Sequence, residues 1–449
     1  MKRYRVQALL ESPLTIKRSR QSNRSQGAAG IAGTVLRGGL AQLYLQQHGK
    51  ADAGFRQLFG EEGHCRFGPL DPAPQVNPRS ALSCKRRPGF DPSTDHGVVD
   101  GLWYRLGQEW LLTPGGTTLL ERQSTLPWTH CQGPRKSAGR CGQPLQPLGS
   151  RFRVSRKDAW GCKTPEEERS LNAHVGIDRV TQTAAQAIFY TIDAFKPTAQ
   201  EQPFCGWIEV DEETLPLLKD LLHQSRPLRE VMAQPQPSGP TTEGQVFLGH
   251  ARTRGYGQVR LILGNAIDRG PDRNSWLAWN HECLDFLRAA PFSQTELDAE
   301  QDFFFSLMFP TGAILVDRWL RATLDPHEML PWLPPMGEWG APGPVQSFGA
   351  GQLRFYTAVT EHELVRGWNA AHGLPKGDDW ATTRGAVYAY HFRGPTDDRD
   401  QLMNQLETLQ TQGIGLRRNE GYGTVVVSDD FHRQFARPAV KPESSEVTP

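Results

Sequence analysis

Residues Gly413–Phe431, GIGLRRNEGYGTVVVSDDF, combine four glycines with Arg417, Arg418 and Tyr422. Glycine lacks a Cβ atom, so its backbone can adopt positive φ and come close to a ligand. Arginine offers a planar set of donors that matches phosphate oxygens. The β-branched run Thr424–Val427 predicts a strand directly after the loop. The stretch therefore predicts a glycine-rich loop that closes a sheet and binds a polyanion.

An earlier stretch, Phe247–Leu263 (FLGHARTRGYGQVRLIL), repeats this order of residue types and leads into an alternating strand pattern. Arginines that contact phosphates and a tyrosine that stacks on a base would make each loop a groove for RNA. The alternatives are a solvated turn and a tyrosine that plugs the core beneath the loop. The candidate RNA-binding residues of the two loops are Arg252, Arg254, Tyr256, Arg417, Arg418, Gly421, Tyr422 and Gly423.

The chain has 449 residues, which at roughly 100–200 residues per domain predicts two or three domains. Its net charge of +1 does not by itself indicate a nucleic-acid partner. No apolar run approaches the length of a membrane span, and Arg5 and Glu11 interrupt any signal-peptide core. We therefore expect a cytoplasmic protein without membrane contact.

Charge is unevenly distributed near the N-terminus, where basic residues face a single acidic one, Glu11, over the first forty positions. A basic stripe of this kind is typical of a phosphate-binding surface. The alternative is a solvated basic loop. A helix that opens beside Arg37 could also hold a phosphate at its N-terminus. The candidates here are Lys17, Arg18, Arg20, Arg24 and Arg37.

Periodicity in the first half predicts a strand, a glycine-rich loop and a helix. Alternation over Tyr4–Leu10 indicates a half-buried strand, and a helical pattern begins near Thr34. Phe204–Val210 reads as a further strand, and Asp211 as the N-cap of a helix that ends near His223. Residues 59–152 lack a long periodic segment and predict a loop-rich insertion.

The second half repeats this plan. Leu353–Val359 and Gly385–Phe392 predict strands, and Leu402, Leu406 and Leu409 share one helical face. The simplest architecture is α+β, with two ferredoxin-like (RNA-recognition type) domains in which a small antiparallel sheet is backed by helices. The expected domains are residues 1–265 and 266–436, followed by a disordered tail at 437–449.

The cysteines favour a metal site or burial over disulfides, because there are seven of them in a long chain without a secretion signal. Four ligands, Cys84, His96, Cys131 and Cys141, fall in the insertion, where a structural zinc would substitute for a missing core. No nucleotide cofactor is expected. The competing ligands are His64, Cys65, His130 and Cys162, whereas Cys205 and Cys283 are expected in the core.

Three residues could serve general acid and base catalysis of RNA cleavage, which needs a group that titrates near neutrality. They are His48, His174 and Asp178, and their spacing does not pair them. A structural or RNA-positioning role is therefore favoured for all three.

Two further segments, Gly30–Tyr44 (GIAGTVLRGGLAQLY) and His174–Thr191 (HVGIDRVTQTAAQAIFYT), precede the glycine-rich loops in a fixed order of motifs. Together these motifs resemble the RAMP superfamily of CRISPR-associated proteins, whose members share ferredoxin-like domains and a C-terminal glycine-rich loop. Leu364–Lys376 (LVRGWNAAHGLPK), with RGAVYAYHF behind it, is most similar to the Csx-ten family of type III-D systems.

The resemblance implies a non-catalytic subunit of a type III CRISPR ribonucleoprotein effector in antiviral defence. Such a subunit would be similar to the Cas five-type subunit that holds the repeat-derived 5′ handle of the guide RNA (crRNA). In such complexes base pairing reads the sequence, while protein contacts go to backbone and shape. The implied partners are the guide RNA, other RAMP subunits and the large subunit, with target RNA left open, and Arg179 joins the RNA-binding candidates.

Three alternatives remain open from the sequence. The first is an endoribonuclease that processes the guide precursor. The second is a backbone subunit that cleaves target RNA through a loop aspartate, for which Asp178 is the candidate. The third is a zinc-dependent protein-interaction module.

Overall fold

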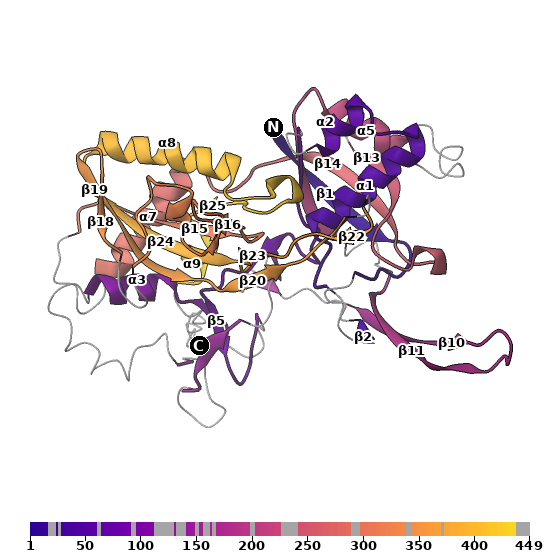
Figure 1. Cartoon of the computed structure of the whole chain (residues 1–449). Helices are drawn as coiled ribbons and strands as arrows, with labels where there is room; N and C mark the ends of the chain where they lie inside the picture. Colours follow the sequence, from indigo (N-terminus) through magenta and orange to yellow (C-terminus); the bar gives the residue numbers. More distant parts are fainter. Residues whose placement is uncertain are drawn as a thin grey trace, which may run out of the picture.

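Two five-stranded sheets form the centres of two bodies that lie side by side in the computed structural model (Figure 1). One sheet is built from strands before residue 268 and the other from strands after residue 301. Within the described residues, no helix is both long and apolar enough to span a membrane. The structure describes residues 1–16, 24–25, 28–60, 64–90, 96–111, 130–131, 141–148, 152–155, 162–163, 168–197, 203–225, 241–288, 297–337, 343–369 and 372–436.

The first sheet has the strand order β13-β14-β1-β12-β3, and all neighbouring strands pair antiparallel. The predicted alternation holds in its central strand, where Val6 and Ala8 are buried and Arg5 is exposed. Three helices pack against this sheet. The elements are β1 (Lys2–Leu10), α1 (Gly33–His48), α2 (Ala53–Phe59), β3 (Cys65–Phe67), β12 (Phe204–Val210), α5 (Leu215–His223), β13 (Thr242–Phe247) and β14 (Gln258–Ile267).

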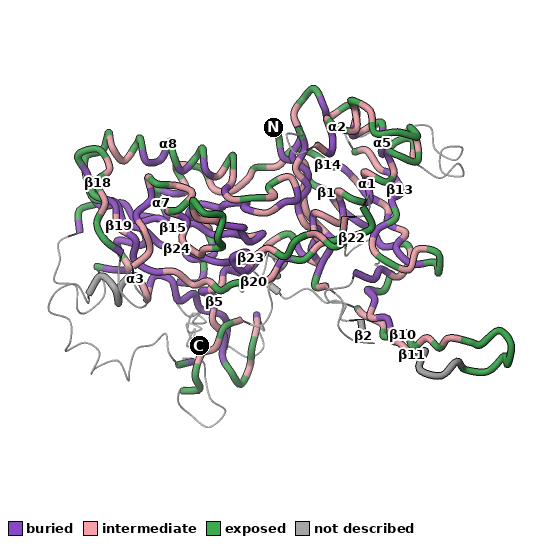
Figure 2. The backbone as a smooth tube through the Cα atoms, in the orientation of Figure 1, coloured by how far each residue is buried: buried purple, intermediate pink, exposed green. Residues whose placement is uncertain are grey.

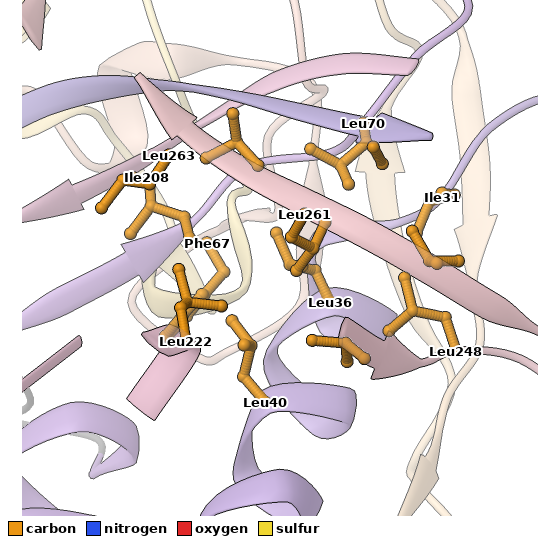
Figure 3. Packing of buried hydrophobic residues seen from close by; sticks show 14 of the residues in the cluster. Ile31, Leu36, Leu40, Phe67, Leu70, Ile208, Leu222, Leu248, Leu261 and Leu263 are labelled. Carbon is orange, nitrogen blue, oxygen red and sulfur yellow. The ribbon is translucent and has the colours of Figure 1, made fainter. Parts of the chain in front are cut away.

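The core of the first body lies between this sheet and its helices. Leu36 and Leu40 fall one turn apart on α1 and point toward Leu261 of β14 (Figure 3). Phe67 of β3 and Leu222 of α5 belong to the same cluster. All five of these side chains are at most 2% exposed. Burial of each such side chain stabilises the fold by about 1.5–3 kcal/mol.

The second sheet has the order β18-β19-β24-β15-β25, again with antiparallel neighbours. Both of its faces are covered, so the run DFFFSLMF of β15 is buried at every position. Phe303 and Phe305 pack on the side of α8, whereas Phe304 and Met308 pack on the side of α3 and α7. The elements are α3 (Leu102–Leu111), α7 (Arg273–Arg288), β15 (Asp302–Phe309), β18 (Val345–Phe348), β19 (Gly351–Val359), β24 (Ala386–Arg393), α8 (Thr396–Gln412) and β25 (Val426–Val427).

A long hairpin of β10 and β11 stands out from the first body (Figures 1 and 2). Parallel pairing with β2 anchors its base, through Thr191 beside Arg24. Apolar side chains on the arm are exposed, including Ile177 at 65% and Phe189 at 61%. The elements of this small sheet are β2 (Arg24–Ser25), β10 (Arg169–Ile177) and β11 (Ala184–Phe195).

Short strands and turns complete the described chain, mostly in the insertion and in the loops of the second body. They are β4 (Gln75–Val76), β5 (Ala81–Cys84), β6 (Val98–Asp100), β7 (Leu145–Pro147), β8 (Phe152–Ser155), β9 (Cys162–Lys163), η3 (Arg252–Arg254), β16 (Leu315–Val316), β17 (Ala322–Thr323), η4 (Pro326–Glu328), β20 (His362–Val365), β21 (Trp368–Asn369), β22 (Leu374–Pro375), β23 (Asp379–Thr382), η5 (Arg418–Glu420) and α9 (Asp430–Gln434).

The two bodies contact each other through buried polar groups as well as backbone. Arg384 after β23 forms a two-pronged ion pair with Asp71 after β3, with its Nη1 2.9 Å from Asp71 Oδ1. Gly33 and Gly421 meet at the same junction, where a Cβ atom on either would collide with the carbonyl of Phe67. Glycine at both positions therefore allows the second glycine-rich loop to dock on the first body.

Several predicted elements differ from the observed ones. The helix expected from Asp211 begins at Leu215. Asp211 makes the hydrogen bond expected of a cap, accepting from the Thr214 amide, but residues 212–214 form a turn ahead of the helix. The strand expected over Thr424–Val427 is confined to Val426–Val427. Tertiary pairing decides the strand boundary, since β25 pairs only where it lies beside β15.

Parts of the predicted insertion, residues 59–152, belong to the main cores. Phe67 belongs to the core of the first body, while Leu102 and Trp103 of α3 pack against the second sheet. These contacts join segments far apart in the chain, so local periodicity did not reveal them. A domain boundary near residue 265 stays a prediction, and the predicted tail, 437–449, lies outside the described residues.

Candidate nucleic-acid interface and metal centre

The two glycine-rich loops share one backbone conformation. In the first, Ala251 has φ 59°, η3 follows, and Gly255 and Gly257 have φ 82° and 86°. In the second, Arg417 has φ 54°, η5 follows, and the corresponding glycines have φ 88° and 73°. The repeated residue types therefore encode a repeated turn, because glycine tolerates the left-handed conformation at both places.

Equivalent hydrogen bonds hold each loop to its own body. The Leu248 amide donates to the Gly257 carbonyl at 2.8 Å, and the Ile414 amide donates to the Gly423 carbonyl at 2.9 Å. Each turn is thereby closed just before a strand of its sheet, β14 or β25. The backbone of both loops is thus fixed without any ligand.

The side chains of the first loop include an exposed arginine, a partly buried arginine and a buried tyrosine. Arg254 is exposed and its guanidinium lies 5.4 Å from the Tyr190 ring centre on the hairpin arm. Arg252 reaches Gln42 of α1. Tyr256 is 8% exposed and accepts a hydrogen bond from Asn172 at 3.0 Å, which is the core-plugging alternative rather than an exposed stacking ring.

Arg417 of the second loop is engaged in a partly buried ionic network. Its guanidinium pairs with Glu420 at 2.6 Å and with Asp379 at 2.9 Å, and it lies over the ring of Tyr422. Glu420 is 6% exposed and also pairs with Lys376. Arg417 is therefore an internal structural residue in this conformation.

Arg418 is exposed and donates to the Gln412 carbonyl at the end of α8, 3.2 Å away. Arg37 also points inward, because it donates to the Phe59 carbonyl and lies 3.9 Å from Glu420. Arg24 contributes backbone to β2, and nothing further is described for its side chain. The remaining N-terminal candidates, Lys17, Arg18 and Arg20, lie outside the described residues.

The catalytic candidates sit on different elements. His48 stacks on Tyr44 at the end of α1, with ring centres 4.0 Å apart. His174 stacks on Tyr190 within the hairpin arm. Asp178 caps the tip of that arm by accepting from the Val180 and Thr181 amides, and these backbone hydrogen bonds lower the pKa of its carboxyl.

The structure therefore gives these three candidates local structural contacts and joins none of them to another. Arg179, beside Asp178 at the hairpin tip, is exposed.

The predicted metal ligands converge. One ligand atom from each of Cys84, His96, Cys131 and Cys141 lies within 4.8 Å of the others. The sulfurs of Cys84 and Cys141 are 3.9 Å apart, and His96 Nδ1 is 3.2 Å from the Cys131 sulfur. Two sulfurs bound to one tetrahedral zinc at about 2.3 Å would lie about 3.8 Å apart, so the donor set fits this ion.

A small sheet, β6-β5-β7, brings the ligands together despite their spacing in the sequence. Cys84 ends β5, and a hydrogen bond from the Cys131 amide to the Gln143 carbonyl (2.8 Å) sets Cys131 beside Cys141. Burial alone would raise the pKa of the Cys84 thiol, but donors from the Arg87 and Arg86 amides outweigh it and the net pKa is lowered. A lower pKa favours the thiolate that binds metal.

The competing ligands His64 and Cys65 lie elsewhere. Cys65 is in the core of the first body, where burial raises the pKa of its thiol to about 12, and His64 pairs with Asp211. Cys283 of α7 is buried as expected, in the cluster that joins α7 to α3 and the second sheet, whereas Cys205 is only partly buried. No side-chain contact is described for Cys162.

Sequence reasoning missed one group of residues at the junction of the bodies. Arg3, Arg66 and Arg269 surround the buried Glu209, from β1, β3 and the turn after β14. They are separated by up to 266 positions, and no local pattern marks them.

Comparisons with known proteins give no match to a family model or to a curated protein. Among solved structures, a chain of the type III-B Cmr-beta complex bound to cognate target RNA and AMPPnP (state 1) is similar at 9% identity and TM-score 0.35, covering 94% of this chain and 99% of that one. A chain of the same complex bound to cognate target RNA has 11% identity, TM-score 0.36 and coverages of 94% and 96%.

The crystal structure of Cmr4 has 11% identity and a TM-score of 0.20 and covers 59% of this chain and 100% of that chain. The structural neighbours are thus subunits of type III-B Cmr complexes. At TM-scores of this size the likeness carries no argument about function.

Proposed function

We propose that this chain is a non-catalytic, guide-RNA-binding subunit of a type III CRISPR ribonucleoprotein effector. The observation that carries the proposal is the pair of glycine-rich loops, which repeat one backbone turn and each present an exposed arginine, Arg254 or Arg418. Guanidinium groups on a preformed loop suit phosphate oxygens. The motif resemblance to the RAMP superfamily supplies the ligand.

Each body is proposed to be a ferredoxin-like domain. In the first, the chain visits β1, α1, β3, β12, α5 and β14, with spatial order β14-β1-β12-β3. In the second, β15, β19, β24, α8 and β25 follow the same path, and the order β25-β15-β24-β19 matches. This agreement supports the proposal, although the described residues between β15 and β19 form loops, short strands and the 3₁₀ turn η4 where α1 stands in the first body.

Within the effector the chain would hold the 5′ handle of the guide, as the resemblance to the Csx-ten family of type III-D systems implies. Arg179 at the tip of the hairpin arm would add a contact outside the two loops. Catalysis is left out of the proposal because His48, His174 and Asp178 are engaged in separate local contacts.

A structural zinc is proposed for the insertion, held by Cys84, His96, Cys131 and Cys141. Three sulfurs and one imidazole are a closed, four-coordinate donor set of the kind that structural zinc sites use. Such an ion would fix a lobe whose described cysteines form a buried cluster with few apolar neighbours.

The test is the affinity of the purified full chain for a labelled repeat-derived RNA, measured by fluorescence anisotropy across a salt series. Arg254→Glu is expected to weaken binding about tenfold and to reduce the salt slope by about 1–2, because a phosphate contact is replaced by repulsion. The position is exposed, so the fold should tolerate the change.

The matched control is Arg318→Glu, which reverses an exposed arginine in the turn between β16 and β17. Equal affinities for Arg254→Glu and Arg318→Glu would remove the first loop from the RNA interface. Absence of binding by the unmodified chain would overturn the proposed function.

A further inference from the structure

Three arginines share one buried carboxylate at the junction of the two bodies. Glu209 Oε1 accepts from Arg3 Nε at 3.0 Å and from Arg269 Nε at 2.8 Å, and Glu209 Oε2 lies 3.4 Å from Arg66 Nη1. The side chain of Glu209 is 2% exposed. A single carboxylate cannot neutralise three guanidinium groups, so the cluster keeps an excess of positive charge.

A fourth arginine adds to this excess from the second body. Arg66 and Arg418 both donate to the Gln412 carbonyl, at 2.9 and 3.2 Å. That carbonyl lies at the C-terminus of α8, which carries a partial charge of only about −0.5. The four arginines therefore exceed the nearby negative charge by more than two units.

The like charges repel one another. Burial lowers the pKa of the Arg66 guanidinium, and the neighbouring Arg418 and Arg269 lower it further. Burial likewise lowers the pKa of Arg3, with Arg269 and Arg66 adding to the effect. An anion beside the cluster would relieve both the repulsion and the missing solvation.

The four arginines become more exposed from Arg3 to Arg418. Arg3 is 8% exposed and lies over the Trp207 ring at 4.3 Å, so it is fixed at the floor. Arg269 and Arg66 are 18% and 22% exposed, and Arg418 is exposed. The hollow lined by Arg3, Arg66 and Arg418 has a volume of about 10 Å³, which is room for about one water molecule. A ligand would therefore sit at the mouth, against Arg66 and Arg418.

We propose that Arg66 and Arg418, backed by Arg3 and Arg269, form a binding site for a phosphate group where the two bodies meet. Planar guanidinium groups bind phosphate oxygens in pairs, and charge-assisted bonds of this kind are short and strong. The phosphate could belong to an RNA backbone or to a free small molecule. The site rests on the proposed function through Arg418, which both share, but inorganic phosphate would occupy it whether or not RNA does.

The experiment compares the unmodified chain, Arg66→Gln and the control Arg318→Gln. Melting temperatures are measured in inorganic phosphate and in sodium chloride of matched ionic strength, and affinity for a single-stranded RNA is measured by anisotropy. We expect phosphate to raise the melting temperature of the unmodified chain and of Arg318→Gln but not of Arg66→Gln. RNA affinity should fall about tenfold in Arg66→Gln alone.

A second measurement needs no variant. Phenylglyoxal modifies accessible arginines, and mass spectrometry of the unmodified chain should show Arg66 and Arg418 protected by phosphate while Arg318 is not. This readout keeps the proposal testable if Arg66→Gln fails to fold.

The outcomes separate the site from the proposed function. Phosphate protection together with a loss of RNA affinity in Arg66→Gln supports a site for RNA phosphate. Phosphate protection without any RNA binding supports a site for a small phosphate and contradicts the proposed function. RNA binding with equal affinity in both variants, and no phosphate protection, overturns the site and leaves the function standing.

Discussion

Glu420 of the second glycine-rich loop gives the basic residues around it a structural role, because it pairs with them. Its carboxylate is 6% exposed and pairs with Arg417 and Lys376, with Arg37 also nearby. Burial alone would raise the pKa of Glu420, but the hydrogen bond from Lys376 and the charge of Arg417 outweigh it, so the net pKa lies below its ordinary value of 4.5. Arg417 thus stabilises the turn by pairing with Glu420.

We expect Glu420→Gln to lower the free energy of unfolding by about 3 kcal/mol at pH 7, because it removes the buried carboxylate from the partly buried Arg417 and Lys376 and leaves only Asp379 to pair with Arg417. A depressed folded pKa stabilises the fold above pH 4.5 and loses that effect as the pH falls through the folded pKa. The difference between the two proteins should therefore shrink below pH 4.5. Urea unfolding at a series of pH values measures it.

Glu407→Gln is the control, since Glu407 forms an exposed pair with Arg273 and should change stability by less than about 1 kcal/mol. A Glu420→Gln protein as stable as this control at pH 7 would show that the network contributes nothing net.

At the scale of elements, the two loops share a backbone but differ in what packs against them. A Cβ atom placed on Gly255 would meet open space, whereas a Cβ atom on the equivalent Gly421 would collide with the Phe67 carbonyl of β3. Both have φ near 85°, at 82° and 88°. The conformational strain of a substitution should therefore be the same, and only the packing term differs.

Gly255→Ala should lower the free energy of unfolding by about 1 kcal/mol, which is the strain of an alanine in the left-handed conformation. Gly421→Ala should lower the free energy of unfolding by about 2 kcal/mol more, because its Cβ atom also overpacks against a backbone carbonyl. Thermal unfolding of the two variants side by side measures the difference. Equal shifts in melting temperature would mean that the second loop does not dock on the first body in solution.

At the scale of the whole molecule, the insertion connects the two bodies. It leaves the first sheet after β3, and its strands β5 and β6 pack Ala81 and Val98 against Phe431 of the second body. The buried pair of Asp100 and His432, 2.8 Å apart, reinforces this contact. The Cys/His cluster lies in the same insertion, so a metal bound there would stabilise the contact between the insertion and the second body.

Purified full-length protein is expected to contain about one zinc per chain, and Cys84→Ser should lose most of it. Elemental analysis measures the metal, and a chelator should lower the melting temperature of the unmodified chain toward that of the variant. The reason is that the ion is bound by the folded lobe and not by the unfolded chain.

Cys283→Ser provides the matched control, because Cys283 is a buried cysteine outside the cluster. It should destabilise the core without changing the zinc content. Metal-free protein, or equal zinc in both variants, would contradict the site.

The sequence alone determined the local features. The alternation around Val6, the helical face of Leu402, Leu406 and Leu409, and the glycines of both loops appear where their patterns predict, because periodicity and φ preference act within a few residues. It also named all four residues of the Cys/His cluster, although their spacing gave no geometry.

Only the tertiary structure decided which arginines pair with carboxylates and which are exposed. Arg417 and Arg418 are adjacent and look alike in sequence, yet one pairs with two carboxylates and the other is exposed. Arg3, Arg66 and Arg269 gain a shared role only because folding brings them to Glu209. Electrostatic partners are set by distance in space, and strand pairing within the first sheet fixes that distance for Glu209, which lies opposite Arg3 and Arg66.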